Sequence, residues 1–275
     1  MNFCQNAVMS QQITRRESLG RLTAGSLLAL GLWPGRIGGA DSSASFRFLV
    51  VNDTHYLTAE CGVWLEGVVG QMKKENAEFC LHAGDLVDNG HREGLGAVSE
   101  IFKGLGVSFY PVIGNHDYLS STDRTGYESI FPKKLNYAWT HEDWQFVALD
   151  SSEGLRYEKT SIQPATFQWL DDNLSKLEAK RPTVIVTHFP LGEGVTYRPL
   201  NSDWLLDRFR DFNLKAVFSG HYHGFTEREA GRTVLTTNRC CALKRDNHDG
   251  TKEKGYFVCD VRNGRLERRF AEYKA

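Results

Sequence analysis

The sequence predicts an α/β fold for most of the chain, and three observations support this prediction. Short apolar runs, often rich in β-branched residues, recur along the chain, and several of them end at a glycine or an aspartate. Segments with apolar residues at helical spacing lie between many of these runs. A chain of 275 residues, of which 41% are hydrophobic, is long enough to build one large core. Alternation of this kind is typical of α/β domains.

The first half of the expected domain alternates strands and helices. The predicted strands are residues 46–52, 80–84 and 107–113, each a short apolar run that ends in a turn signal. Apolar residues at intervals of four from Trp64 to Met72 predict a helix, and residues 93–105 predict a second one. The stretch 118–139 interrupts the pattern with glycine, proline and several aromatic residues, so we expect an inserted loop there.

The second half continues with strands at residues 145–149, 183–187, 214–219, 233–237 and 256–261. Apolar residues from Phe167 to Leu177 predict a helix that ends near Pro182, because proline disfavours helix in the residue before it. We expect Asn201 to cap a short helix that runs to Phe212. No helix is expected between the last two strands.

Charge argues against some classes of partner. The formal net charge is -1 and charged residues make up 24% of the chain. Such a balance is unlike a disordered chain and unlike a protein with a broad basic face for nucleic acid. We therefore expect a small molecule to bind in a local site.

The N-terminal residues 1–40 resemble an export signal. Arg15 and Arg16 precede a modest apolar run at 22–33, and small residues follow it. Paired arginines in this position resemble the twin-arginine signal of bacteria, and an ordinary secretory signal is the alternative. The apolar run is too short for a stable membrane span. This resemblance implies export to the periplasm or the extracellular space.

Cleavage of such a signal could follow Ala40 or Ala44, so residues 41–275 are predicted to form the mature domain. Of the six cysteines in the chain, five lie in this domain. A disulfide that joins Cys61 to Cys240 or Cys241 would suit an oxidising compartment.

Seven side chains follow the predicted strands, and they combine two carboxylates, one amide and four imidazoles. They are Asp53, His55, Asp85, Asn115, His188, His221 and His223. Ligands collect at the carboxyl ends of strands in open α/β sheets, so we expect these side chains to converge. The mixture suits manganese, iron or zinc better than an all-oxygen magnesium or calcium site. Two metal ions about 3.5 to 4 Å apart are a recurring device for phosphoryl transfer.

The order of these residues is specific to one family. The motifs are D-x-H at Asp53, G-D-x-x-D at Gly84, G-N-H-D at Gly114, the single His188 and G-H-x-H at Gly220. Together they resemble the calcineurin-like metallophosphoesterase superfamily over residues 46–225. The resemblance implies a four-layer α/β/β/α sandwich, in which two mixed β-sheets are flanked by helices. It also implies two divalent or trivalent transition metal ions as cofactors.

Residue roles follow from the resemblance, position by position. Asp53, His55 and His223 would hold the first ion, Asn115, His188 and His221 the second, and Asp85 would bridge them. A hydroxide activated by the two ions would attack the phosphate, with His116 as general acid and Asp117 as its assistant. Asn115 and His116 would also contact the substrate, and Arg198, in the loop after His188, is a further candidate for phosphate binding.

The implied activity is hydrolysis of phosphate mono- or diesters. The purple acid phosphatase branch has a tyrosine three positions after the bridging aspartate, and this chain has Asp88 there. A small-molecule phosphodiester is therefore favoured, and an acid-phosphatase-like monoesterase is the alternative. A metal-containing binding protein without turnover is a third possibility, from a different class. Substrate, metal identity and oligomeric state stay open.

Other polar and aromatic residues are expected to have ordinary structural roles. Asp88 is expected either to hydrogen-bond a ligand histidine or to cap a strand end. The histidines outside the seven-residue set are His82, His91, His141 and His248, besides His116, and we expect no ligand among these four. Tyr118, Tyr127, Tyr137 and Trp139 are expected to pack against the domain, and the alternative is that they line a substrate mouth. The mixed charges from Arg239 to Lys254 predict a solvated face.

Overall fold

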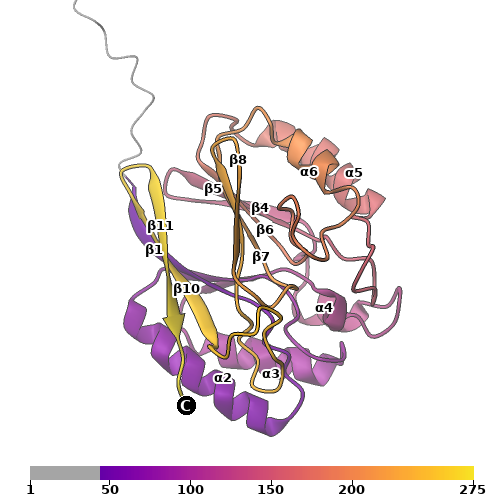
Figure 1. Cartoon of the computed structure of the whole chain (residues 1–275), viewed down its shortest axis with the longest axis vertical. Helices are drawn as coiled ribbons and strands as arrows, with labels where there is room; N and C mark the ends of the chain where they lie inside the picture. The colour runs from indigo at the N-terminus through magenta and orange to yellow at the C-terminus, as the bar shows by residue number, and fades with distance from the viewer. Residues whose placement is uncertain (1–43) are drawn as a thin grey trace, which may run out of the picture. The chain divides into compact units, whose positions relative to one another are not determined.

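A computed structural model of the chain describes residues 44–275. The predicted export signal at 1–40 lies outside these residues. Two mixed β-sheets form the centre of the described domain, and helices cover their outer faces (Figure 1). The predicted fold class, a four-layer α/β/β/α sandwich, is confirmed.

The first sheet has five strands in the order β11-β10-β1-β2-β3. Their bounds are β1 Ser45–Val51, β2 Phe79–His82, β3 Ser108–Pro111, β10 Gly255–Arg262 and β11 Arg265–Glu272. Strands β1, β2 and β3 run parallel, whereas β10 is antiparallel to both of its neighbours. The parallel strands read as continuous apolar runs because both faces of the sheet are covered.

The second sheet has six strands in the order β4-β5-β6-β7-β9-β8. Their bounds are β4 Tyr137–His141, β5 Trp144–Leu149, β6 Thr183–Thr187, β7 Leu214–Ser219, β8 Thr226–Ala230 and β9 Thr233–Thr237. Strands β5, β6, β7 and β9 are parallel, and antiparallel strands β4 and β8 form the two edges.

Aromatic side chains fill the space between the two sheets. Phe48 and Phe79 of the first sheet stack with ring centroids 5.1 Å apart, and Phe146 of the second meets Phe79 edge-on at 5.1 Å. All three rings are fully buried. Offset and edge-to-face pairs at such distances are favourable beyond the burial of their area. This layer holds the sheets together face to face.

Helices cover the outer faces of both sheets. The α-helices are α2 Ala59–Met72, α3 Arg92–Lys103, α4 Thr125–Ile130, α5 Pro164–Asn173 and α6 Ser202–Arg208. Short 3-10 helices are η1 Lys73–Glu75, η2 Asn115–Asp117 and η3 Leu174–Lys176. Leu65 of α2 and Phe102 of α3 pack on the first sheet, while Leu170 of α5 and Leu205 of α6 pack on the second.

Four local predictions are wrong. Residues 118–139 form more than a loop, because they contain α4 and the start of β4, where Trp139 stacks on Tyr110 at 3.9 Å. The helix expected to end near Pro182 stops earlier, in the 3-10 turn η3. Asn201 precedes α6 but does not cap it, because its side chain bonds both main-chain groups of Ile162 instead. That helix also ends at Arg208 rather than Phe212.

The aromatic residues of 118–139 pack against the domain, as predicted. Tyr118 and Tyr127 are buried, and the hydroxyl groups of Tyr127 and Tyr137 both donate to the carbonyl of Pro111. All five cysteines between residues 44 and 275 are buried and free, so the disulfide considered for Cys61 does not form in the structure.

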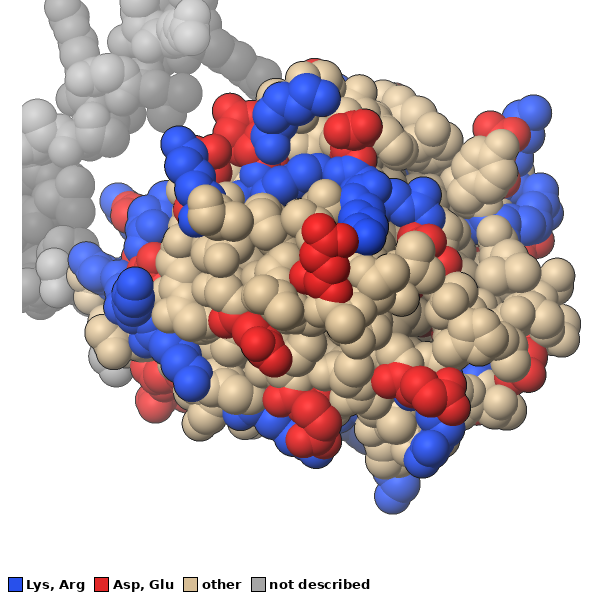
Figure 2. Space-filling view, turned by 90° about the horizontal axis from the view of Figure 1, so that it is seen from below, with Lys and Arg blue, Asp and Glu red and all other residues tan. Residues whose placement is uncertain are grey.

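The described surface carries both signs of charge. On the face drawn in Figure 2, carboxylates lie among lysines and arginines, which form a band across its upper part. Ion pairs such as Arg208 with Asp171 and Lys244 with Glu60 join some of these groups. None of the helices between residues 44 and 275 has the length and apolar character that a membrane span needs.

Candidate metal centre

The ends of five parallel strands converge on one site. Asp53 and Asp85 follow β1 and β2, Asn115 begins η2 after β3, and the second sheet supplies His188 after β6 and His221 after β7. Parallel strands end at the same edge of a sheet, which brings these residues together. The structure places all seven predicted ligands there, and each is at most 7% exposed.

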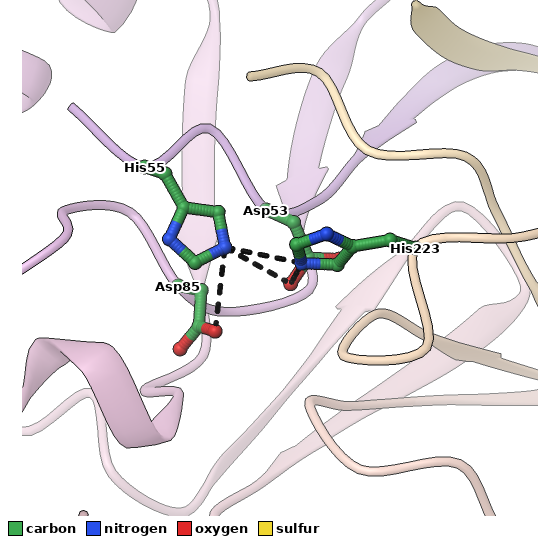
Figure 3. A group of neighbouring side chains, drawn as sticks. All are labelled: Asp53, His55, Asp85 and His223. Carbon is green, nitrogen blue, oxygen red and sulfur yellow. Dashed lines mark hydrogen bonds and ion pairs between the residues drawn. The ribbon is translucent and has the colours of Figure 1, made fainter. Parts of the chain in front are cut away.

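Two clusters of possible ligand atoms share Asp85. The first contains Asp53, His55, Asp85 and His223 (Figure 3). In it, His223 Nε2 lies 3.3 Å from Asp53 Oδ1, and His55 Nε2 lies 3.6 Å from Asp85 Oδ2.

The second cluster contains Asp85, His188 and His221. Its shortest ion pair joins His188 Nε2 to Asp85 Oδ2 at 3.2 Å. Asn115 belongs to the same group, because its Oδ1 lies 3.1 Å from His188 Nε2. The shared carboxylate therefore connects two adjacent places for a cation.

The histidines of each cluster point ring nitrogens at each other. His55 Nε2 and His223 Nε2 are 3.1 Å apart, and His188 Nε2 and His221 Nδ1 are 3.2 Å apart. The other nitrogen of each ring faces an acceptor: Asp88 Oδ1 for His55, and the carbonyls of Asp246, Ala83 and Tyr157 for His223, His188 and His221. These acceptors place hydrogens on the outer nitrogens, so the inner nitrogens are left to face each other and the carboxylates of Asp53 and Asp85. The inner nitrogens are therefore the atoms that would bind a metal ion.

The pKa values of His188 and His221, the second pair, are shifted in opposite directions. Burial favours neutral His188, but Asp85 outweighs it and raises the pKa of His188 to about 9. Burial and the neighbouring His188 lower the pKa of His221 to about 3. One extra proton thus occupies the pair near neutral pH, and a metal ion would replace it.

Asp88 orients one of these histidines from outside. Burial opposes its ionisation, but the hydrogen bond from His55 and the charge of Arg245 lower the pKa of Asp88 to about 2. The ionised carboxylate accepts from His55 Nδ1 at 3.1 Å, so His55 Nε2 faces the cluster. Of the two roles expected for Asp88, the structure shows the hydrogen bond to a candidate ligand.

Five of the seven candidate ligands have a left-handed backbone, which is uncommon for residues other than glycine. Their φ angles are 51° for Asp53, 43° for His55, 53° for Asp85, 65° for His221 and 49° for His223. Main-chain hydrogen bonds between the first two loops hold this conformation, from Asp53 N to Gly84 O at 3.0 Å and from His55 N to Asp85 O at 3.1 Å. Such strained positions cluster at functional sites.

His116 lies beside the clusters, partly exposed. Its amide donates to Asp85 Oδ1 at 2.9 Å, and its ring Nδ1 donates to the main-chain oxygen of Asp88 at 3.0 Å. The expected assistant, Asp117, lies elsewhere: its buried carboxylate accepts from the amides of Val87 and Gly114 at 3.0 and 2.8 Å. Asp117 therefore braces two of the strand-end loops, and Asp88 is the acidic residue that the His116 ring contacts.

A cavity of about 410 Å³ opens over the clusters. Of the predicted site residues it is lined by His55, Asp85, Asn115, His116, His221 and His223. It is also lined by five residues that the sequence did not indicate: Leu155, Tyr157, Tyr197, Arg245 and His248. They come from loops with no motif, and His248 is not among the possible metal ligands in the described part of the chain. The sequence indicated only that substrate preference depends on loops such as 189–203 and 238–255, which contain Tyr197, Arg245 and His248.

Arg198 does not reach this cavity. Its Nε donates to the carbonyl of Leu191 at 2.7 Å, and its guanidinium pairs with Asp203 at 2.5 Å. These two contacts hold the side chain against its own loop. The structure gives no support to the phosphate contact expected of Arg198, and Arg245 is the arginine that lines the cavity.

The sandwich and the paired clusters define an α/β protein whose described residues could hold two metal ions. A model of the calcineurin-like phosphoesterase family matches residues 46–225. The chain belongs to this family. The match ends at the loop after His223, before the segment that supplies Arg245 and His248.

A curated relative and several solved structures resemble the chain. A probable glycerophosphodiester phosphodiesterase GpdQ from Arcobacter nitrofigilis is 29% identical over 160 residues, which cover 54% of this chain and 58% of that protein. A dimetal phosphatase from Danio rerio has a TM-score of 0.62 at 15% identity and covers 82% of this chain and 95% of its own. The purple acid phosphatase PPD1 from yellow lupin has a TM-score of 0.63 at 14% identity, over 83% of this chain and 52% of its own. At such identities the two structures show the common fold.

Proposed function

We propose that the protein hydrolyses small-molecule phosphodiesters at a centre of two transition metal ions, manganese, iron or zinc. The proposed ligands are Asp53, His55 and His223 for one ion, Asn115, His188 and His221 for the other, and Asp85 for both. The observation that carries this proposal is that both histidine pairs face each other through ring nitrogens, 3.1 and 3.2 Å apart, beside the carboxylates of Asp53 and Asp85. Nitrogen and carboxylate donors together suit ions of this class.

When bound, two such ions neutralise the charge of the phosphate and make a water molecule more acidic. Side chains of the protein protonate the leaving group and bind the substrate. His116 protonates the leaving alcohol, and its bond to the main-chain oxygen of Asp88 orients the ring toward the cavity. Asn115, which lines the same cavity, donates its amide hydrogens to the substrate.

A diester preference has two supports. The relative from Arcobacter nitrofigilis is named as a probable phosphodiesterase. Position 88 holds an aspartate engaged with His55 and Arg245, in place of the tyrosine of the purple acid phosphatase branch. A phosphomonoesterase is the second candidate, because the fold is shared with the lupin phosphatase.

Metal-loaded protein assayed with bis-p-nitrophenyl phosphate and with p-nitrophenyl phosphate tests the proposal. We expect hydrolysis of both, with the larger kcat/KM for the diester. A larger value for the monoester would favour the second candidate. No hydrolysis of either by protein that carries two metal ions would favour a binding protein without turnover.

We also propose that the protein is exported. The support is the sequence of residues 1–40, with Arg15 and Arg16 before an apolar run. Replacing both arginines with lysine should retain the protein in the cytoplasm of a bacterial host if the signal is of the twin-arginine type. Export that is unaffected by the replacement would favour an ordinary secretory signal, and retention of the unaltered chain would contradict export.

A further inference from the structure

Arg245 is the one lysine or arginine that lines the cavity in the described part of the chain. Its Nε donates to Asp88 Oδ1 at 2.9 Å, and its Nη2 contacts the same oxygen. The ring of His116 lies near the same oxygen, with Nδ1 3.9 Å from Asp88 Oδ1. Arg245 and His116 are thus placed by a common neighbour, and both face the cavity.

The guanidinium keeps unused hydrogen-bonding capacity. An arginine has five N–H donors, and the contacts to Asp88 use two of them. The remaining donors, including both on Nη1, have no partner among residues 44–275. A planar guanidinium with free N–H donors at the edge of a cavity is suited to binding a phosphate group. It can donate to phosphate oxygens in more than one orientation.

The loop that carries Arg245 is fastened to the metal centre. The carbonyl of Asp246 accepts from His223 Nδ1 at 3.2 Å, and the amide of His248 donates to the carbonyl of His223 at 3.0 Å. Asn247, between them, is buried and bonds main-chain groups on both sides of the loop. Because a candidate ligand fixes the loop, Arg245 is held in place before a substrate arrives.

We propose that Arg245 binds a non-bridging oxygen of the substrate phosphate, on the side from which His116 protonates the leaving group. This inference rests on the proposed phosphoesterase function. The arginine lies beyond the residues that match the family, 46–225. It supplies the anion contact that the sequence suggested for Arg198.

Two neighbouring substitutions test the contact. Arg245→Gln removes the charge in the cavity, whereas Lys244→Gln removes an equal charge from the adjacent residue, which pairs with exposed Glu60 at 2.8 Å. We expect Arg245→Gln to raise KM for bis-p-nitrophenyl phosphate and the inhibition constant of inorganic phosphate by about 10- to 100-fold, as for loss of a charge-assisted hydrogen bond. Lys244→Gln should leave both values unchanged.

A second comparison separates direct binding from an effect through Asp88 and His55. In protein that already carries Asp88→Asn, Arg245→Gln should still weaken phosphate binding by about tenfold or more, with metal content equal to that of the single variant. Loss of the effect in that background, or equal phosphate affinity in Arg245→Gln and the unaltered chain, would overturn the inference. Phosphate affinity can be measured by calorimetry without turnover. Both results are therefore independent of the proposed function, which is tested by the activity of the unaltered protein.

Discussion

A methyl group added at Gly114 would collide with the residue shared by both clusters. An ideal Cβ at this position lies 2.2 Å from Asp85 Oδ1 and 2.4 Å from the amide nitrogen of Asp85. Ordinary van der Waals contact begins at 3.4 Å, so one partner must move by more than an ångström. The contacted atoms are main chain and a buried carboxylate, which cannot swing aside. Gly114→Ala is therefore a direct perturbation of the metal centre.

The size of the effect follows from this displacement. Overpacking of a buried site costs about 1 to 3 kcal/mol of stability. A shift of about 1 Å in a group that positions the reaction costs on the order of 100-fold in turnover. Asp85 Oδ1 also accepts the amide of His116 at 2.9 Å, so moving Asp85 displaces the proposed proton donor as well.

Gly70→Ala is the matched control. Gly70 lies in α2, and nothing is within 4 Å of a Cβ built there. Alanine is favoured over glycine inside a helix by about 1 kcal/mol, so this variant should be slightly more stable and fully active.

Elemental analysis, kcat with bis-p-nitrophenyl phosphate and thermal unfolding in a chelator would be measured for both variants. Unfolding without metal separates damage to the fold from damage to the centre. We expect Gly114→Ala to bind fewer than two metal ions and to lose about 100-fold in kcat, as estimated from its displacement. A Gly114→Ala protein with two bound ions and the kcat of the control would refute the reasoning.

Three further predictions concern the metal centre. Asp88→Asn removes the charged acceptor of His55 Nδ1, so the affinity for one metal ion should fall by about 10- to 100-fold in a metal titration. An unchanged metal affinity would contradict the role of Asp88. His116→Ala should lower kcat by about 10² to 10⁴ and keep two bound ions, whereas Asp85→Ala should lose metal; equal metal loss in both would disprove the assigned roles. Reloading chelated protein should release protons, because the pKa of His188 is raised to about 9 and the metal-free pair holds a proton below that pH. Metal affinity should thus increase from about pH 6 to about pH 8 in calorimetry, and a constant affinity would contradict the extra proton.

Much of the fold was predictable because its parallel strands are short apolar runs. The predicted strands 183–187 and 214–219 coincide with β6 and β7. Strands β8 and β11 were not predicted, because their sequences are mostly charged and exposed. Both are edge strands and pair with a neighbouring strand on one side only. Their sequences therefore lack the apolar signal of a buried strand.

The sequence by itself selected the residues that meet at the strand ends. Each of these residues directly follows a buried strand or lies within a short motif there, so its place depends mainly on local structure and on the parallel order of the strands. The sequence also identified the residue types, carboxylates, an amide and imidazoles, that can hold two transition metal ions.

Only the tertiary structure decided what surrounds the candidate ligands. It turned the Asp117 carboxylate toward backbone amides and left Asp88 to contact His55 and His116. It also brought Arg245 into the cavity from a loop 157 positions beyond Asp88. Such contacts depend on the direction of each side chain and on the packing of distant loops, and neither leaves a periodic signal in the sequence.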